Sequence, residues 1–171
     1  MIDIAILEKL IERNGKYNFT KLVDYLLDTG FVYQDRKLRG PLAIATLNGV
    51  LLDMSVIDRY HDKLVYFILL HETAHMKRIG RMGKELMLAN LSIEDFGEFT
   101  AHIFEEEIFA DRYACSLFYR FNKEIYPWYE TQQLNLKYKQ DQYESSARMY
   151  YGKIQNNEEK YNEMISQFII D

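Results

Sequence analysis

The stretch that decides the fold is residues 58–77, DRYHDKLVYFILLHETAHMK, which we expect to form one helix. Lys77, Arg78 and Gly80 mark its expected end, because basic side chains and glycine favour a helix C-terminus. Its longest apolar run, residues 64–70, is far shorter than the ~20 residues that span a bilayer. The helix is therefore predicted to pack one apolar face inward in a water-soluble domain.

Two histidines stand four residues apart near the end of this helix. This spacing offsets His71 and His75 by only about 40° around the helix, so both imidazoles can bind one metal ion. Glu72 lies about 100° from His71, which turns its carboxylate beside the metal, where it can take a proton from bound water. Leu64 and Ile68 share the stripe of the histidines, which puts both rings on the inward face. The alternative is a pair of core histidines with hydrogen-bonded partners.

A third protein ligand is required, because zinc is usually four-coordinate and a catalytic site keeps one position for water. The next long predicted helix offers Glu107, which lies in the middle of an apolar stripe where a bare carboxylate is costly to bury. Its neighbours Glu105 and Glu106 point about 160° and about 100° away, and they suit a solvated acidic run. The sequence therefore assigns Glu107, with the two histidines, as a ligand of Zn²⁺, and Glu72 as the general base.

Further polar residues follow on the same helix. Asp111 comes one turn after Glu107, and a metal-bound histidine normally donates its remaining ring N–H to a carboxylate or carbonyl. We expect Asp111 to accept that bond from His71; the alternative is a structural ion pair with an arginine or lysine. His102 lies about 140° from Glu107, which makes it a poor fourth ligand. His102 and Tyr113 are candidate donors to the oxyanion of a reaction intermediate.

The HExxH motif at residues 71–75 and the segment EIFADRYA at residues 107–114 resemble the gluzincin metallopeptidases, and most of all the ImmA/IrrE-type minimal gluzincins. In that group a similar segment, Glu-x-x-Ala-Asn/Asp-x-Phe/Tyr-Ala, closes the metal site. The resemblance covers about residues 40–120. It implies a zincin-like core, a zinc ion, hydrolysis of peptide bonds, and a protein or peptide substrate, often a regulatory protein. It also implies an edge strand beside the cleft that can pair with an extended peptide.

Carried over position by position, the resemblance makes the two histidines and Glu107 the ligands, Glu72 the base and Asp111 a supporting carboxylate. Ala74 stands where the family often has glycine, and alanine is also small. The tyrosine-rich stretch after Pro127 has no counterpart in the family. The resemblance therefore agrees with the helical spacing about the site and adds nothing about the C-terminal third.

A β-hairpin is predicted just before the HExxH helix. Residues 42–47 and 50–54 are short apolar runs joined by Asn48-Gly49. That dipeptide supplies two positive-φ residues for a two-residue hairpin turn. We therefore expect a small antiparallel element beside the metal site.

Most of the remaining chain is predicted to be helical. The predicted helices cover residues 3–13, 18–28, 92–121, 131–155 and 157–169, and residues 79–91 form a connector with one or two helical turns. Gly30 ends the second helix, and Ser92 is the expected N-cap of the third, with Asp95 sharing the capping role. The sum is an α-dominated α+β fold in one domain, residues 1–171, with a metallopeptidase core at about 40–122 and a helical C-terminal extension at about 127–171.

Composition excludes several classes of partner. A net charge of -5 gives no basic surface for nucleic acid or an anionic membrane. Cys115 is the only cysteine, so an intrachain disulfide is impossible and nothing indicates an oxidising compartment. The N-terminus lacks the basic and apolar regions of a signal peptide. We therefore expect a cytoplasmic protein.

Other functions remain open at this point. The fold could belong to a catalytically silent zincin-like domain that binds or regulates a partner protein. The helices after Pro127 could then form the binding surface or an interface between copies of the chain. A purely structural zinc site would require His102 as fourth ligand, at an unsuitable angle. Reading residues 3–28 as a DNA-binding helix-turn-helix conflicts with the acidic balance of the chain.

Overall fold

The computed structural model describes residues 1–124 and 136–171, except for the side chains of residues 136–139 and 142. The fold is mostly helical with one small sheet, so the predicted α-dominated α+β class is confirmed. The boundary expected at Pro127 and the helix start expected near residue 131 lie outside the described residues. In chain order the elements are α1 (Ile4–Glu12), α2 (Phe19–Thr29), β1 (Tyr33–Asp35), β2 (Ala43–Ala45), β3 (Val50–Leu52), α3 (Met54–Ile57), α4 (Asp62–Met82), α5 (Lys84–Asn90), α6 (Phe96–Asn122), α8 (Leu136–Tyr150) and α9 (Glu158–Ser166).

The sheet has three strands in the order β1-β3-β2, so β2 forms one edge. β2 and β3 are the predicted antiparallel hairpin, with Ala45 opposite Val50. β1 lies parallel to β3, which makes the sheet mixed rather than antiparallel. No sequence pattern predicts β1, because three residues are too few to show an alternation of buried and exposed side chains.

The glycine of the hairpin has a different purpose from the expected one. The positive φ angles of the described residues all lie elsewhere, so the prediction of two positive-φ residues at Asn48-Gly49 is wrong. A Cβ on Gly49 would lie 2.6 Å from the carbonyl oxygen of Val32, the residue just before β1. Val50 donates its N–H to that same oxygen at 2.8 Å. Glycine is required here because two backbones come close together.

Helix α4 is shifted along the chain relative to its prediction. It begins at Asp62, where the side chain of His61 accepts a hydrogen bond from the N–H of Leu64. The separate short helix α3 precedes it. At its other end α4 continues through Gly80 and stops at Gly83, whose φ of 86° suits glycine. Glycine at an exposed helical position is tolerated, so Gly80 is not the stop that the sequence predicted.

Helix α6 begins later than predicted. Its N-cap is Asp95, whose Oδ1 accepts the N–H of Glu98 at 2.8 Å. Ser92 instead donates to the carbonyl of Leu88 at the end of α5 and accepts the N–H of Asn156. The predicted Ser92 cap is therefore wrong, because this hydroxyl ties together the end of α5 and the segment before α9.

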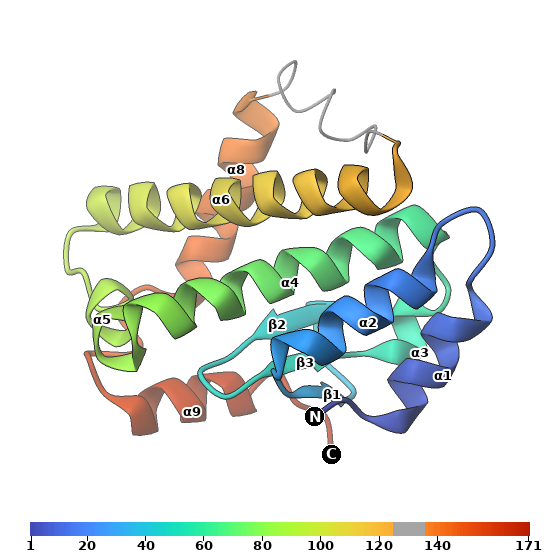
Figure 1. Ribbon diagram of the computed structural model, residues 1–171. Coiled ribbons are helices and arrows are strands. Elements are labelled where there is room, and N and C mark those ends of the chain that lie inside the picture. The colour runs from blue at the N-terminus through green and yellow to red at the C-terminus, as the bar shows by residue number, and fades with distance from the viewer. Residues whose placement is uncertain (125–135) are drawn as a thin grey trace.

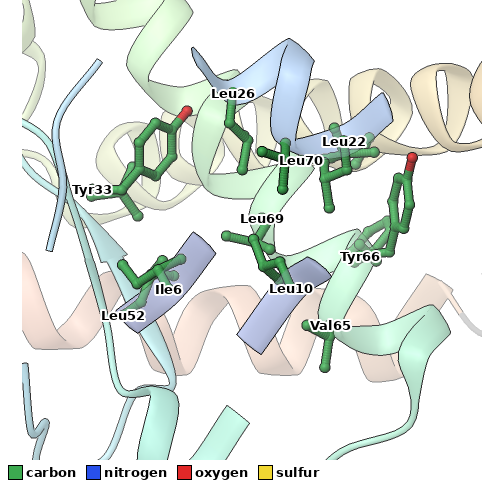
Figure 2. Close-up of a cluster of buried hydrophobic side chains, with 14 of the residues drawn as sticks. Ile6, Leu10, Leu22, Leu26, Tyr33, Leu52, Val65, Tyr66, Leu69 and Leu70 are labelled. Atoms are coloured by element: carbon green, nitrogen blue, oxygen red, sulfur yellow. The ribbon is translucent and has the colours of Figure 1, made fainter. Parts of the chain in front are cut away.

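Helix α4 lies at the centre of the molecule, between α6 and the sheet (Figure 1). Its face toward α1, α2 and the sheet is apolar, and it forms the main hydrophobic core. Figure 2 shows these side chains together with those of α1, α2, β1 and β3; the labelled residues are Ile6, Leu10, Leu22, Leu26, Tyr33, Leu52, Val65, Tyr66, Leu69 and Leu70. Burial of this face fixes the rotation of α4, and that rotation turns His71 and His75 toward α6.

The C-terminal helices complete the fold on two sides. α8 packs against α6, and α9 lies below the sheet in Figure 1. α9 contributes Tyr161, Met164 and Ile165 to a second apolar cluster, which also holds Ile44 and Leu51 from the strands. Since β3 is buried along its whole length, both faces of the sheet are covered. Within the described residues, no helix has the length and apolar character needed to cross a bilayer.

Candidate metal centre

Helices α4 and α6 bring the three predicted ligands together. Nε2 of His71 lies 3.2 Å from Oε2 of Glu107, and Nε2 of His75 lies 3.1 Å from Oε1 of the same carboxylate. The two Nε2 atoms are 3.2 Å apart. Among the histidine, cysteine and acidic side chains of the described residues, the ligand atoms of these three lie close enough together to hold one metal ion.

These distances match the size of a tetrahedral metal site. Bonds of ~2.0–2.1 Å at tetrahedral angles would separate neighbouring ligand atoms by about 3.3 Å. The separations of 3.1–3.2 Å among His71, His75 and Glu107 are close to that value. The three side chains are 14%, 17% and 25% exposed, so the site is shielded but open on one side. It could hold a cation and still leave a position for water.

The row of three glutamates divides as the helical rotation predicted for Glu105 and Glu107, but not for Glu106, which was expected to be solvated and is only 15% exposed. Glu105 is exposed. Glu106 pairs with Arg78 of α4, with its Oε1 3.0 Å from the guanidinium. Only Glu107 points at the imidazoles. The assignment of register in this acidic run therefore agrees with the structure.

Asp111 lies where the sequence predicted it, against the ring of His71. Oδ1 of Asp111 is 2.9 Å from Nδ1 of His71, and the aspartate is only 2% exposed. Its other oxygen, Oδ2, accepts a hydrogen bond from the hydroxyl of Tyr143 in α8. A carboxylate on Nδ1 favours the tautomer with its proton there, which leaves the Nε2 lone pair facing His75 and Glu107.

The electrostatics of the cluster favour a cation. Burial would lower the pKa of His71, but hydrogen bonds to Asp111 and Glu107 outweigh it and raise that pKa well above its usual value. Burial also opposes charge on His75, and the carboxylate of Glu107 again raises its pKa. Burial opposes ionisation of Glu107, yet the two imidazoles hold its pKa below the usual range. A proton or a metal ion can supply the positive charge that these carboxylates stabilise.

Glu72 lies beside this cluster and is held by the sheet edge. Its Oε2 accepts the N–H of Ala45 in β2 at 2.8 Å. Its Oε1 has no hydrogen-bond partner among the described residues. Glu72 lines the same cleft as the three candidate ligands, so the free oxygen can accept a proton from a water molecule there.

Of the two candidate oxyanion donors predicted from the sequence, only one lines the cleft. His102 lines it, together with His71 and Glu107. Tyr113 does not, because its hydroxyl lies 2.6 Å from that of Tyr25 on α2, toward the other end of the core. The structure therefore does not bring Tyr113 to the cleft, because its side chain faces α2.

Helix α8 adds residues that no motif predicted. Tyr143 reaches Asp111, and Ser146, Met149 and Tyr150 line the cleft. The pKa of Tyr150 is raised, first by burial and then by the charges of Glu72 and Glu107, which line the same cleft. The spacing of Tyr143, Ser146 and Tyr150 puts them on one helix face, and this is the signal that could have found them.

Apolar side chains form much of the rest of the cleft wall. Six of them come from β2, α4, α5, α6 and α8: Ile44, Ile79, Met82, Met87, Ile103 and Met149. Polar side chains outside the candidate ligands also line it, among them Arg78, Asn90 and Ser146. Such a site combines apolar contact area for a substrate with a few converging polar groups.

Comparisons with protein families, with curated proteins and with solved structures find no match to this chain.

Proposed function

We propose that this protein is a zinc-dependent metallopeptidase of the gluzincin type. The observation that carries the proposal is the convergence of two imidazole Nε2 atoms and one carboxylate within 3.1–3.2 Å of each other, with Glu72 beside them. Two histidines and a glutamate are the ligand set of several zinc peptidases, which leave the fourth position to water. His71, His75 and Glu107 would hold the ion.

A zinc ion bound there would polarise a carbonyl oxygen and lower the pKa of a bound water toward ~7. Glu72 is then the general base: its Oε1 accepts the water proton while Oε2 stays on the N–H of Ala45. The same carboxyl group returns the proton to the leaving amine. Asp111 keeps the proton of His71 on Nδ1, so Nε2 remains a ligand.

The free edge of β2 supports an extended peptide as substrate. Hydrogen bonds from Thr46 to Gly49 and from Asp53 to Leu42 flank the hairpin ladder, so the backbone groups of Ala43 and Ala45 face away from β3. Glu72 occupies the N–H of Ala45. The remaining outward groups can pair with a peptide strand lying along the cleft. We propose a protein or peptide substrate bound in this way.

Tyr150 is the best-situated donor for the oxyanion. It lines the cleft from α8, and its hydroxyl has no hydrogen-bond partner among the described residues. A hydroxyl that is unpaired in the free protein can be aimed at the charge that develops on the scissile carbonyl. His102, which also lines the cleft, is the second donor of suitable position.

The direct test compares wild type with Glu72→Gln in a peptide-library digestion read by mass spectrometry. Both proteins should contain one zinc, and the variant should cleave about 10²–10⁴-fold more slowly, because it has lost the general base. Glu105→Gln is the matched control. Glu105 is exposed on α6, so this substitution removes the same charge at a position away from the site. Zinc content without cleavage by wild type would favour the alternative, a metal-stabilised module that binds a partner protein.

We further propose a cytoplasmic setting. Cys115 is buried and the sequence holds no second cysteine, so the fold depends on no intrachain disulfide and tolerates a reducing compartment.

A further inference from the structure

We propose that Tyr143 of helix α8 is a positioning residue of the metal centre, which acts on the metal ligand His71 through Asp111. The inference rests on the metal site of the proposed function. It goes beyond that function because it gives Tyr143, which carries no recognisable motif, a role in how tightly the site binds metal.

Three helices form one chain of hydrogen bonds. The hydroxyl of Tyr143 in α8 donates to Oδ2 of Asp111 in α6. Oδ1 of the same carboxylate lies 2.9 Å from Nδ1 of His71 in α4. Nε2 of His71 then lies 3.2 Å from Glu107. The chain therefore runs from α8 to the point where the ligand atoms converge.

The burial of this chain makes its geometry demanding. Asp111 is 2% exposed and Tyr143 is 5% exposed, so water has little access to the bond between them. A buried carboxylate is stable only if its oxygens accept hydrogen bonds. Here each oxygen has its own donor, on a different helix. Both donors together fix the rotation of the carboxylate about its Cβ–Cγ bond.

That rotation decides how well His71 can serve as a ligand. The Nδ1–H of His71 needs an acceptor in line with it, and this bond orients the ring and sets its tautomer. Without the hydroxyl of Tyr143, Oδ2 would lose this hydrogen bond and the rotation of the carboxylate would be less firmly fixed. The ring of His71 would then be held less firmly, and metal affinity would fall.

Tyr143 is itself held in place by packing. Its ring contacts Phe104 of α6 with centroids 5.3 Å apart, and α8 packs along α6. The hydroxyl is therefore aimed by the docking of α8 on α6. Any movement of α8 away from α6 would be felt at His71.

The test measures zinc affinity by competition with a chromogenic chelator for wild type, Tyr143→Phe, Asp111→Ala and the double variant. Loss of an outer partner costs about 10–100-fold in metal affinity, so we expect Asp111→Ala in that range and Tyr143→Phe near the lower end, about tenfold. The double variant should bind zinc as Asp111→Ala does, because Tyr143 has then lost the group through which it acts.

Tyr66→Phe is the matched control. Tyr66 is a fully buried tyrosine on α4, and its hydroxyl donates to the carbonyl of Asn18 at 3.0 Å, in the core away from the metal cluster. Its loss removes a buried hydroxyl and should leave zinc affinity unchanged. Cobalt substitution adds a spectroscopic readout: the ligand-field bands should shift in Tyr143→Phe and stay unchanged in Tyr66→Phe.

The outcomes separate the two proposals. Wild type that binds no zinc would overturn the metal centre and this inference together. Wild type that binds zinc, with Tyr143→Phe equal to it in affinity and in the cobalt spectrum, would overturn only the role of Tyr143. Tyr143→Phe could also lower zinc affinity by the same factor in wild type and in Asp111→Ala. That result would overturn the role of Tyr143 too, because the effect would not pass through Asp111.

Discussion

Two clusters of ionisable side chains lie on α4, one at each half, and they differ in how their charges are balanced. At the first turn, the guanidinium of Arg13 lies 2.7 Å from Asp62 and 3.3 Å from Asp58. Further along, His71 and His75 face the carboxylate of Glu107. The first cluster contains its own permanent cation. The described partners of the second include no lysine or arginine.

This difference distinguishes a structural cluster from the cluster that we propose binds a metal ion. The guanidinium of Arg13 stays positively charged, so it pairs with Asp58 and Asp62 without a bound metal ion. Both aspartates are more than a third exposed, so the pairs are screened by water. Glu107 instead depends on imidazoles that carry charge only when protonated. Arg78, the nearby arginine, is paired with Glu106. A cluster built in this way requires protons or a metal ion to be stable.

The largest effect should come from removing a candidate ligand. His75→Ala should weaken zinc binding by more than the 10–100-fold typical of outer partners, and calorimetric titration would measure it. In wild type, zinc at ~1,000 times its dissociation constant should add ~4 kcal/mol to the free energy of unfolding. Asp62→Asn, in the other cluster, should keep both values. Equal zinc binding by His75→Ala and wild type would remove the distinction between the clusters.

Tyr150→Phe should have the next largest effect. If its hydroxyl donates to the oxyanion, kcat should fall about 10²-fold with little change in KM, because the bond forms only in the transition state. Zinc content should be unaffected, which separates this tyrosine from Tyr143. Steady-state kinetics on a peptide found in the library digestion would measure it. An unchanged kcat would exclude Tyr150 and leave His102 as the donor to examine.

The pH dependence of stability should differ in sign with and without zinc. Burial opposes protonation of His71 and His75, but the carboxylates raise both pKa values above those of the unfolded chain. In metal-free protein this stabilisation is complete below the unfolded pKa of ~6.5, and it is lost as pH rises through the folded pKa values. Zinc requires neutral imidazoles, so the zinc-loaded protein should gain stability over the same range.

Urea unfolding between about pH 6 and about pH 8.5, with a chelator or with zinc, would measure the two slopes. Opposite slopes are expected. Parallel slopes in the two series would mean that the imidazoles do not bind the metal.

The smallest effect should come from the first cluster. Asp62 is 39% exposed, and Arg13 keeps Asp58 and the carbonyl of Tyr60 as partners when it is changed. We expect Asp62→Asn to lower the free energy of unfolding by no more than about 1 kcal/mol, and less at high salt. Thermal unfolding at two salt concentrations would measure it. If Asp62→Asn lowered the free energy of unfolding as much as His75→Ala does, both clusters would contribute equally to stability.

The convergence of the candidate ligands could be predicted because it is set by local rotation within two helices. Spacing of four residues puts His71 and His75 on one face, and the same rotation selects Glu107 from its acidic neighbours. The contact of Asp111 with His71 follows from the next turn of α6. These predictions needed only helix geometry and the expectation that α4 and α6 pack together.

Features that depend on distant segments could not be predicted in this way. Tyr143 and Tyr150 reach the site because α8 docks on α6, and nothing in their local pattern specifies that docking. Gly49 looked like a turn residue but is needed for the approach of Val32, the residue just before the unpredicted strand β1. Tyr113 has a plausible position in the motif, yet its rotation on α6 directs it to Tyr25.

The predicted boundaries of α4 and α6 were wrong for a related reason. Local signals at Gly80 and Ser92 are real preferences, but tertiary contacts outweighed them. Ile79 is buried beyond the predicted stop of α4, and Ser92 is occupied by Leu88 and Asn156. Each boundary was decided by packing rather than by the strongest local residue.

The central claim is that two helices direct three side chains at one zinc ion, and anomalous diffraction at the zinc absorption edge tests it most directly. In crystals of zinc-replete protein, we expect one strong peak at ~2.0–2.1 Å from Nε2 of His71, Nε2 of His75 and a carboxylate oxygen of Glu107. No peak among these three side chains, or a peak bound only by other residues, would contradict it.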